Sequence, residues 1–263
     1  MKEVQTAQKR LWYSFTTVSS YSSPVSEHAF MLRCVPLESD GQRIERSDVQ
    51  VIDCPYLTSY ASEASGDLRY GMIASPHKRF IFISQGIVVR RDSPRIDEGL
   101  SPETYMYPTQ LTRAGHQMRD AARQAAGTTP CAKALSIMHI VNSRIAYKCG
   151  VTSIDTGAAE AWELGCGVCQ DYAHILIAMC REVGIAARYV SGYMCGEGAT
   201  HAWVEVWDGK RWLSLDPTHD READLCYIKL SQGCDASECA VVRGVYRGAF
   251  EETNTVRIIV EEL

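Results

Sequence analysis

One cysteine of this chain lies where a long amphipathic segment begins, a position that makes a thiol reactive. Residues 170–184 read QDYAHILIAMCREVG, with apolar side chains at helical spacing and Gly184 as a natural end. Cys169 therefore falls at or just before the first turn of a helix. The partial positive charge at a helix N-terminus favours thiolate over thiol, and an N–H group there can stabilise an oxyanion. The pattern predicts a nucleophilic cysteine.

A histidine and an aspartate follow in a predicted β-hairpin. The segments HAWVEVW and KRWLSLD both alternate, and Asp208-Gly209 between them is a favoured dipeptide for a two-residue turn. Such a turn pairs Trp207 with Lys210, and counting outward places His201 directly opposite Asp216. Cross-strand Cβ atoms are about 4.5–5.5 Å apart, which allows a carboxylate–imidazole hydrogen bond. A one-residue slip would separate the two side chains, and the apolar pattern agrees with the unslipped register.

Together the three residues supply a nucleophile, a base and an orienting carboxylate. Asp216 would fix the tautomer of His201, which would deprotonate Cys169 and later protonate the leaving amine. His174 is a poorer candidate for the base, because five positions along a helix turn its side chain about 140° away from Cys169. The pattern predicts the His–Asp pairing, but it does not show that Cys169 reaches His201.

Cys166 and Cys169 also form a C-x-x-C motif, which can indicate a redox dithiol or half of a zinc site. No second pair of cysteines with zinc-ligand spacing is present. A thioredoxin-like fold would need an early strand before the motif and a parallel sheet, and the sequence pattern predicts neither. We therefore expect neither a metal nor a cofactor. A reversible Cys166–Cys169 disulfide that switches the thiol off remains a hypothesis.

The elements that must position these residues change character along the chain. Residues 1–95 are rich in β-branched and aromatic segments separated by turns, which predicts a small β-sandwich. Residues 96–263 begin with helices predicted at 112–126, 131–146 and 156–164, and end with strands predicted at 187–194, 201–207, 210–216 and 255–261. This order favours an α+β fold, with helices packed on an antiparallel sheet in the second domain.

Composition narrows the function classes. The chain has 263 residues and a formal charge of −5, and it shows no basic patch for nucleic acid. No apolar run approaches the roughly 20 residues that span a bilayer. The start, MKEVQTAQKRLWYSF, lacks the apolar stretch of a secretory signal, and the eleven cysteines form an odd number. We therefore expect free thiols, a cytoplasmic location and no membrane partner.

Two segments closely resemble the transglutaminase-like superfamily, specifically the bacterial transglutaminase-like cysteine peptidases. They are GVCQDYAHILIAMCREVGIAARYVSGY and HAWVEVWDGKRWLSLDPTHD. The resemblance implies that Cys169 is the nucleophile, His201 the base and Asp216 the orienting residue, on a papain-like core without a metal. The β-rich first 95 residues and the tail also look like those of this family. The chain departs from it at Gly233-Cys234-Asp235-Ala236, where relatives tend to have Gly-Arg-Asp-Tyr.

The predicted function is cleavage of amide or peptide bonds through a thioester on Cys169. Attack of water on that thioester gives hydrolysis, which we favour, whereas attack of an amine gives transamidation or cyclisation. A non-catalytic binding module is the third possibility. The expected partner is a peptide, a protein or a small amide, while the particular substrate, the oligomeric state and the role of the first domain are not predicted.

Overall fold

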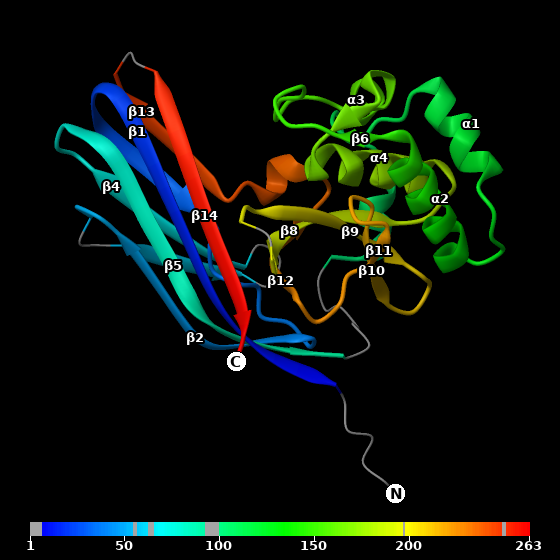
Figure 1. The fold of residues 1–263 in the computed structure, drawn as a ribbon, viewed down its shortest axis with the longest axis horizontal. Coiled ribbons are helices and arrows are strands. Elements are labelled where there is room, and N and C mark those ends of the chain that lie inside the picture. The colour runs from blue at the N-terminus through cyan, green and yellow to red at the C-terminus, as the bar shows by residue number, and fades with distance from the viewer. Residues whose placement is uncertain (1–6, 55–56, 63–65, 93–99, 197, 249–250) are drawn as a thin grey trace, which may run out of the picture.

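A computed structural model describes residues 7–54, 57–62, 66–92, 100–196, 198–248 and 251–263 of the chain. A long, curved antiparallel sheet forms one side of the molecule, helices form the other, and a smaller sheet lies between them (Figure 1). The predicted α+β class is confirmed. No helix among the described residues is long and apolar enough to cross a membrane.

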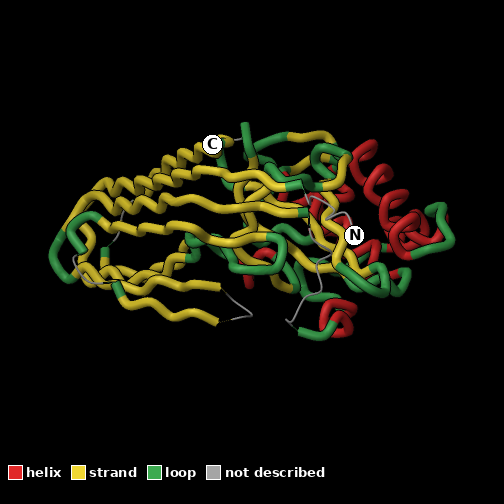
Figure 2. Tube along the Cα trace, turned by 90° about the horizontal axis from the view of Figure 1, so that it is seen from below, coloured by secondary structure: helices red, strands yellow, loops and turns green. Residues whose placement is uncertain are grey.

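The large sheet is organised around one long strand, β1 (Gln8–Leu32). Its first half pairs with β5 and β14, and its second half pairs with β4 and β13, with an irregularity between Ser20 and Val25. The sheet therefore curls back on itself, as Figure 2 shows from below, and Phe30 of the second half packs on Phe80 of β5. The other strands are β2 (Gln42–Val51), β3 (Thr58–Ser62), β4 (Gly66–Ile73), β5 (His77–Arg91), β13 (Val242–Arg247) and β14 (Glu252–Glu262).

The two C-terminal strands lie in this first sheet rather than in the sheet beside the helices. Strand β14 pairs with β1 from Leu11↔Glu262 to Tyr21↔Glu252, and β13 pairs with the second half of β1. The sequence analysis assigned residues 96–263 to the second domain. The strands within residues 242–262 nevertheless pair with β1, which belongs to the predicted first domain. The division into 1–95 and 96–263 stays a prediction in every other respect.

The helical half surrounds one buried helix, α4 (Cys169–Glu182). Its apolar residues and those of the β9 face made by Ala202, Val204 and Val206 share one hydrophobic core. The other helices pack around α4, at positions close to those predicted: α1 (His116–Gln124), α2 (Pro130–Arg144) and α3 (Ala158–Leu164). The shorter elements are η1 (Pro102–Met106), η2 (Ala236–Cys239) and the parallel pair β6 (Ala146–Tyr147) and β7 (Cys166–Gly167).

The smaller sheet has the strand order β11-β10-β9-β8-β12 and connects the two halves. Tyr193 of β8 and Ile228 and Leu230 of β12 belong to the same hydrophobic core as the large sheet. Burial of these side chains stabilises the contact between the halves, because each removes apolar surface from water. The strands are β8 (Ala187–Met194), β9 (His201–Trp207), β10 (Trp212–Asp216), β11 (Arg221–Glu222) and β12 (Tyr227–Gly233).

The register of the β9–β10 hairpin differs from the prediction. Trp207 pairs with Trp212 rather than with Lys210, so the connection has four residues instead of two. The side chain of Asp208 accepts hydrogen bonds from the backbone N–H groups of Lys210 and Arg211 at 2.8 and 2.9 Å, which stabilises the longer turn. The prediction that His201 lies directly opposite Asp216 is therefore wrong, although the shift of two residues keeps both on their predicted face.

Candidate active site

Cys169 is the first residue of α4, as the sequence pattern predicted. The helix start is fixed by Asp171, whose Oδ2 accepts hydrogen bonds from the Val168 N–H at 2.7 Å and the Thr152 hydroxyl at 2.8 Å. A Cβ on Gly167 would lie only 2.5 Å from the same Oδ2, so the chain needs glycine at this position. These contacts hold the thiol at the positive end of the helix, where the first N–H groups have no intrahelical partner.

His201 and Asp216 form a buried hydrogen bond despite the shifted register. His201 Nε2 lies 2.8 Å from Asp216 Oδ2, and the side chains are 5% and 0% exposed. The two residues are diagonal neighbours on the same face of paired strands, and diagonal partners are within reach of long side chains. Because Nε2 faces Asp216, Nδ1 is the ring nitrogen left for the Cys169 thiol, and Cys169 and His201 line the same cleft.

The electrostatics of this pair favour a charged imidazole. Burial lowers the pKa of His201, but its hydrogen bonds with Asp216 and Cys169 outweigh that effect and raise the pKa to about 9. Burial likewise raises the pKa of Asp216, and the hydrogen bond from His201, supported by Tyr227 and His219, brings it down to about 2. At neutral pH the arrangement therefore stabilises an imidazolium held by a carboxylate.

Two residues that support Asp216 were missed by the sequence analysis. Its Oδ2 also accepts hydrogen bonds from His219 Nδ1 at 2.8 Å and from the Tyr227 hydroxyl at 2.7 Å. Its Oδ1 accepts from the backbone N–H groups of Thr218 and His219 at 3.0 and 3.3 Å. His219 belongs to the DPTHD segment and could have been suspected there, whereas nothing in the sequence links Tyr227 of β12 to Asp216.

His201, Asp216 and His219 are also the only group of three potential ligands with metal-binding spacing among the described residues, their ligand atoms lying within 4.8 Å of one another. In this group both rings face Asp216 Oδ2 at hydrogen-bond distance, so the carboxylate is already neutralised by N–H donors. The group includes neither Cys166 nor Cys169, both of which are free thiols. The geometry therefore gives no support to a zinc site at the C-x-x-C motif.

His174 lies away from Cys169, as its helical spacing predicted. It is completely buried, and its Nε2 accepts a hydrogen bond from the backbone N–H of Ala236 at 3.1 Å. Burial lowers its pKa to about 4, so the ring is neutral at physiological pH. This contact holds η2 beside α4. Ala236, at the position where relatives tend to have tyrosine, lines the cleft described next.

A cleft of about 730 Å³ exposes Cys169 and His201 to a substrate. Its walls come from the helical half, from the start of β9, and from residues 236–243, which lead into β13. The lining includes the apolar side chains Leu111, Tyr147, Ile154, Val168, Tyr189, Val241 and Val242, and the charged side chains Asp155 and Arg243. Clefts of this size that combine apolar walls with a few polar groups are typical of binding sites.

Comparisons with known proteins agree with this architecture. Residues 119–217 match the family model of the transglutaminase-like superfamily. The fold resembles a crystal structure of a candidate cysteine protease from Cytophaga hutchinsonii, with a TM-score of 0.80 and 21% identity over 98% of this chain and 93% of that one. Residues 119–217 therefore form a transglutaminase-like domain, as the resemblance predicted, and the likeness to the solved structure shows that the fold of the chain is shared.

Two mycobacterial proteins are among the curated relatives. An uncharacterised protein of Mycobacterium leprae is 32% identical over 59% of this chain and 57% of its own length. An uncharacterised protein of Mycobacterium tuberculosis is 36% identical over 49% of this chain and 48% of its own length. The chain thus spans about half the length of the curated relatives it matches.

Proposed function

We propose that the chain is a thiol-dependent enzyme that cleaves amide bonds of peptides or proteins, with Cys169, His201 and Asp216 as its catalytic residues. The observation that carries the proposal is the buried 2.8 Å His201–Asp216 hydrogen bond beside a thiol at a helix N-terminus. The nucleophile and the base line one cleft, and the orienting carboxylate is buried and hydrogen-bonded to the base.

Before the first half of the reaction the proton of the Cys169 thiol passes to His201 Nδ1, which gives the imidazolium that the site favours at neutral pH. The Cys169 sulfur then attacks the carbonyl carbon of the substrate as a thiolate. Negative charge develops on the carbonyl oxygen, where N–H groups at the start of α4 can donate hydrogen bonds. The C–N bond then breaks, and the imidazolium gives its proton to the departing amine. Asp216 keeps the ring oriented and stabilises its positive charge throughout.

The second half releases the acyl group. Water attacks the thioester carbon, His201 accepts the proton of that water, and the proton returns to the departing sulfur of Cys169. An amine that enters instead of water gives a new amide, which is the transamidation alternative. Both outcomes use the same residues, so the choice depends on which nucleophile reaches the thioester.

The first test is alkylation with iodoacetamide at neutral pH, followed by mapping of modified cysteines by mass spectrometry. We expect Cys169 to react well ahead of the other thiols and the His201→Ala variant to react more slowly at this position. His116→Ala is a matched control, because His116 is an exposed histidine of α1 that pairs with Asp120. Uniform slow labelling of all cysteines would refute an assembled catalytic site.

Turnover is tested with a peptide library prepared from a proteome digest, incubated with and without an added primary amine. New termini detected by mass spectrometry would establish cleavage, and amine-labelled termini would establish transfer. Selective labelling of Cys169 without either product would leave the non-catalytic reading as the better one.

A further inference from the structure

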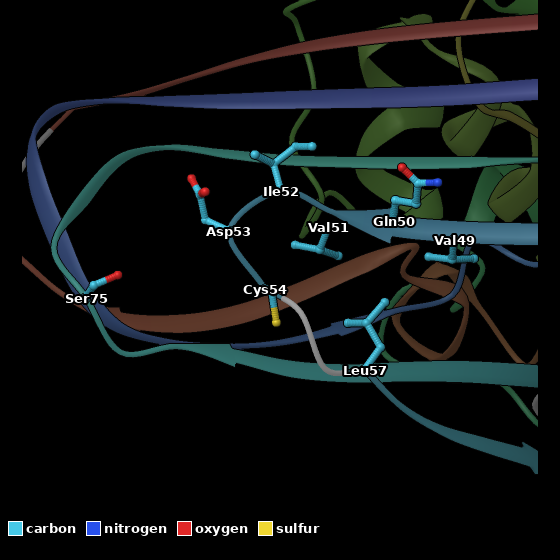
Figure 3. Close-up of a pocket in the computed structure, with 8 residues that line it drawn as sticks. All are labelled: Val49, Gln50, Val51, Ile52, Asp53, Cys54, Leu57 and Ser75. Atoms are coloured by element: carbon cyan, nitrogen blue, oxygen red, sulfur yellow. The ribbon is translucent and has the colours of Figure 1, made fainter.

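A second pocket of about 370 Å³ opens next to the catalytic cleft, inside the curled sheet. The two share Thr200, Val241 and Val242, and Thr200 directly precedes His201. The volume lies within the range of small-ligand sites, about 300–1,000 Å³. The hollow in Figure 3, between Val49–Cys54, Leu57 and Ser75, shares no lining residue with the cleft and carries no comparable argument.

The inner face of the sheet changes from apolar to polar at this pocket. Along β1 the inward side chains run Leu11, Tyr13, Phe15, Thr17, Ser19, and along β14 their partners run Glu262, Val260, Ile258, Val256, Asn254. Core packing accounts for the apolar half of both series, since Phe15, Ile258 and Val260 are buried together. The polar half lines the pocket instead, which indicates that the space between the strands is shaped for something other than a protein core.

One polar group in the wall has no partner of its own. Thr17 is 6% exposed, and its hydroxyl makes no hydrogen bond with the rest of the described chain. A buried hydroxyl without a partner costs about 1–3 kcal/mol, so such groups normally have a ligand or another polar neighbour. Since Thr17 lines the pocket, a bound donor could satisfy it there.

Aromatic rings and one carboxylate define the chemistry of the pocket. Phe15, Tyr21, His28 and Tyr246 line it, with His28 and Tyr246 edge to face at 5.1 Å. Glu252 is the one carboxylate in the lining that the structure describes, and it accepts a hydrogen bond from the Tyr246 hydroxyl at 2.6 Å. Burial and the adjacent His77 lower the pKa of His28 to about 4, so that ring adds no positive charge at neutral pH.

These groups match a basic side chain better than an apolar one. Aromatic faces attract a cation, a carboxylate pairs with it, and Val242 and Val256 can cover its aliphatic stem. An apolar occupant would leave the Thr17 hydroxyl without a partner and would place nothing positive beside the Glu252 carboxylate. The pocket adjoins the cleft at Thr200, beside the base that protonates the departing amine, which places it on the leaving-group side of the cleaved bond.

The geometry points to a specificity subsite in the curled sheet that holds a lysine or arginine side chain of the polypeptide on the C-terminal side of the cleaved bond. This inference rests on the proposed function for the direction of the chain, although binding itself does not require turnover. It also gives the β-rich half a role beyond packing, because β1, β13 and β14 would select the substrate.

The test uses the full chain carrying Cys169→Ala and fluorescein-labelled Gly/Ala octapeptides in which a single lysine is moved through the positions. A second set carries the neutral norleucine instead, whose side chain keeps the four carbons of lysine and lacks the ammonium group. Fluorescence anisotropy at low salt should show about 5- to 10-fold tighter binding of lysine than of norleucine at one position. Glu252→Gln should reduce this preference below about twofold. Glu261→Gln, on the opposite face of β14, should leave it unchanged.

Equal binding of the two peptide sets, or no binding of either, overturns the subsite. Retention of the lysine preference in Glu252→Gln does so as well. Cleavage of the preferred peptide by the protein with Cys169 intact tests the proposed function separately. Lysine-dependent binding without cleavage would refute the proposed enzyme activity and support the subsite. Cleavage without any preference for a basic residue C-terminal to the cut would support the enzyme activity and refute the subsite.

Discussion

Replacement of Asp216 by asparagine tests the electrostatic design of the site with the smallest change of shape. The amide keeps the size of the carboxylate but removes its charge. One of its two terminal atoms becomes an NH₂ group, which cannot accept the hydrogen bonds that His201, His219 and Tyr227 donate to Oδ2. The variant therefore loses the stabilisation of the imidazolium and gains a conflict between donors.

The magnitude follows from the pKa of His201, which is raised from 6.5 to about 9. The difference of 2.5 at 1.36 kcal/mol per pKa unit gives roughly 3 kcal/mol in favour of the charged ring. Cys169 contributes part of this, so Asp216→Asn should remove up to that amount. Loss of roughly 3 kcal/mol corresponds to about a 10²-fold smaller population of the imidazolium.

The sign of the pH dependence follows from the same shift. A raised pKa means that the imidazolium persists at neutral pH and is lost only as the pH rises toward about 9. In Asp216→Asn burial acts on the ring without the opposing carboxylate. We therefore expect His201 to be neutral at any pH above its ordinary pKa of 6.5. At the acid end, the pKa of Asp216 of about 2 means that its contribution to stability is lost only as the pH falls from 3.8 toward that value.

The assay is the rate of Cys169 alkylation by iodoacetamide between about pH 5 and pH 10, with each cysteine followed by mass spectrometry. We expect the rate near pH 7 to fall by about 10- to 100-fold in Asp216→Asn, and the two profiles to converge at high pH. Asp220→Asn is the matched control, since Asp220 pairs with His139 at the surface. A variant with the rate and pH profile of the unaltered protein would refute the role given to Asp216.

Three further predictions test the surroundings of the site. Gly167→Ala should destabilise the protein by about 1–3 kcal/mol in chemical unfolding and slow alkylation of Cys169, because the added Cβ meets Asp171. Gly198→Ala should do neither, since no atom lies within 4 Å of a Cβ added there. Tyr227→Phe should cost about 0.5–1.5 kcal/mol and slow alkylation less than Asp216→Asn does; unchanged stability would count against its hydrogen bond. Peroxide should protect Cys169 from alkylation by forming the Cys166–Cys169 disulfide, and a reductant should remove the protection. The disulfide hypothesis fails if peroxide protects Cys169 equally in the Cys166→Ser variant.

The site elements that depend on local pattern were predictable from the sequence. Helix α4 begins at Cys169 because an apolar series at helical spacing starts there, and Asp171 at its third position caps it. The helices of the second half also lie close to their predicted ranges, since amphipathic spacing decides them. Local propensity and tertiary packing agree over these segments, which is why the pattern was sufficient.

Features that depend on distant partners were not predictable in the same way. The sequence predicted a strand at 255–261, within β14, and none over β13, and nothing in the residues of either strand indicates that β1 is its partner. Tyr227 reaches Asp216 only because β12 lies in the same sheet as β10, although two other strands, β9 and β8, separate them in the strand order. Such contacts follow from the closing of the fold, which a single sequence does not specify.

The hairpin shows why a wrong register could still give the right pair. The side chains of a strand alternate with a period of two, so an error of two residues preserves the face of every side chain while changing its opposite partner. Asp216 accordingly lies on the face of His201 in both registers, and the longer side chains bridge the diagonal at 2.8 Å. An error of one residue would have placed Asp216 against α4 with the valines. The apolar alternation of β9 and β10 therefore specified the face, whereas Asp208 decided the length of the turn.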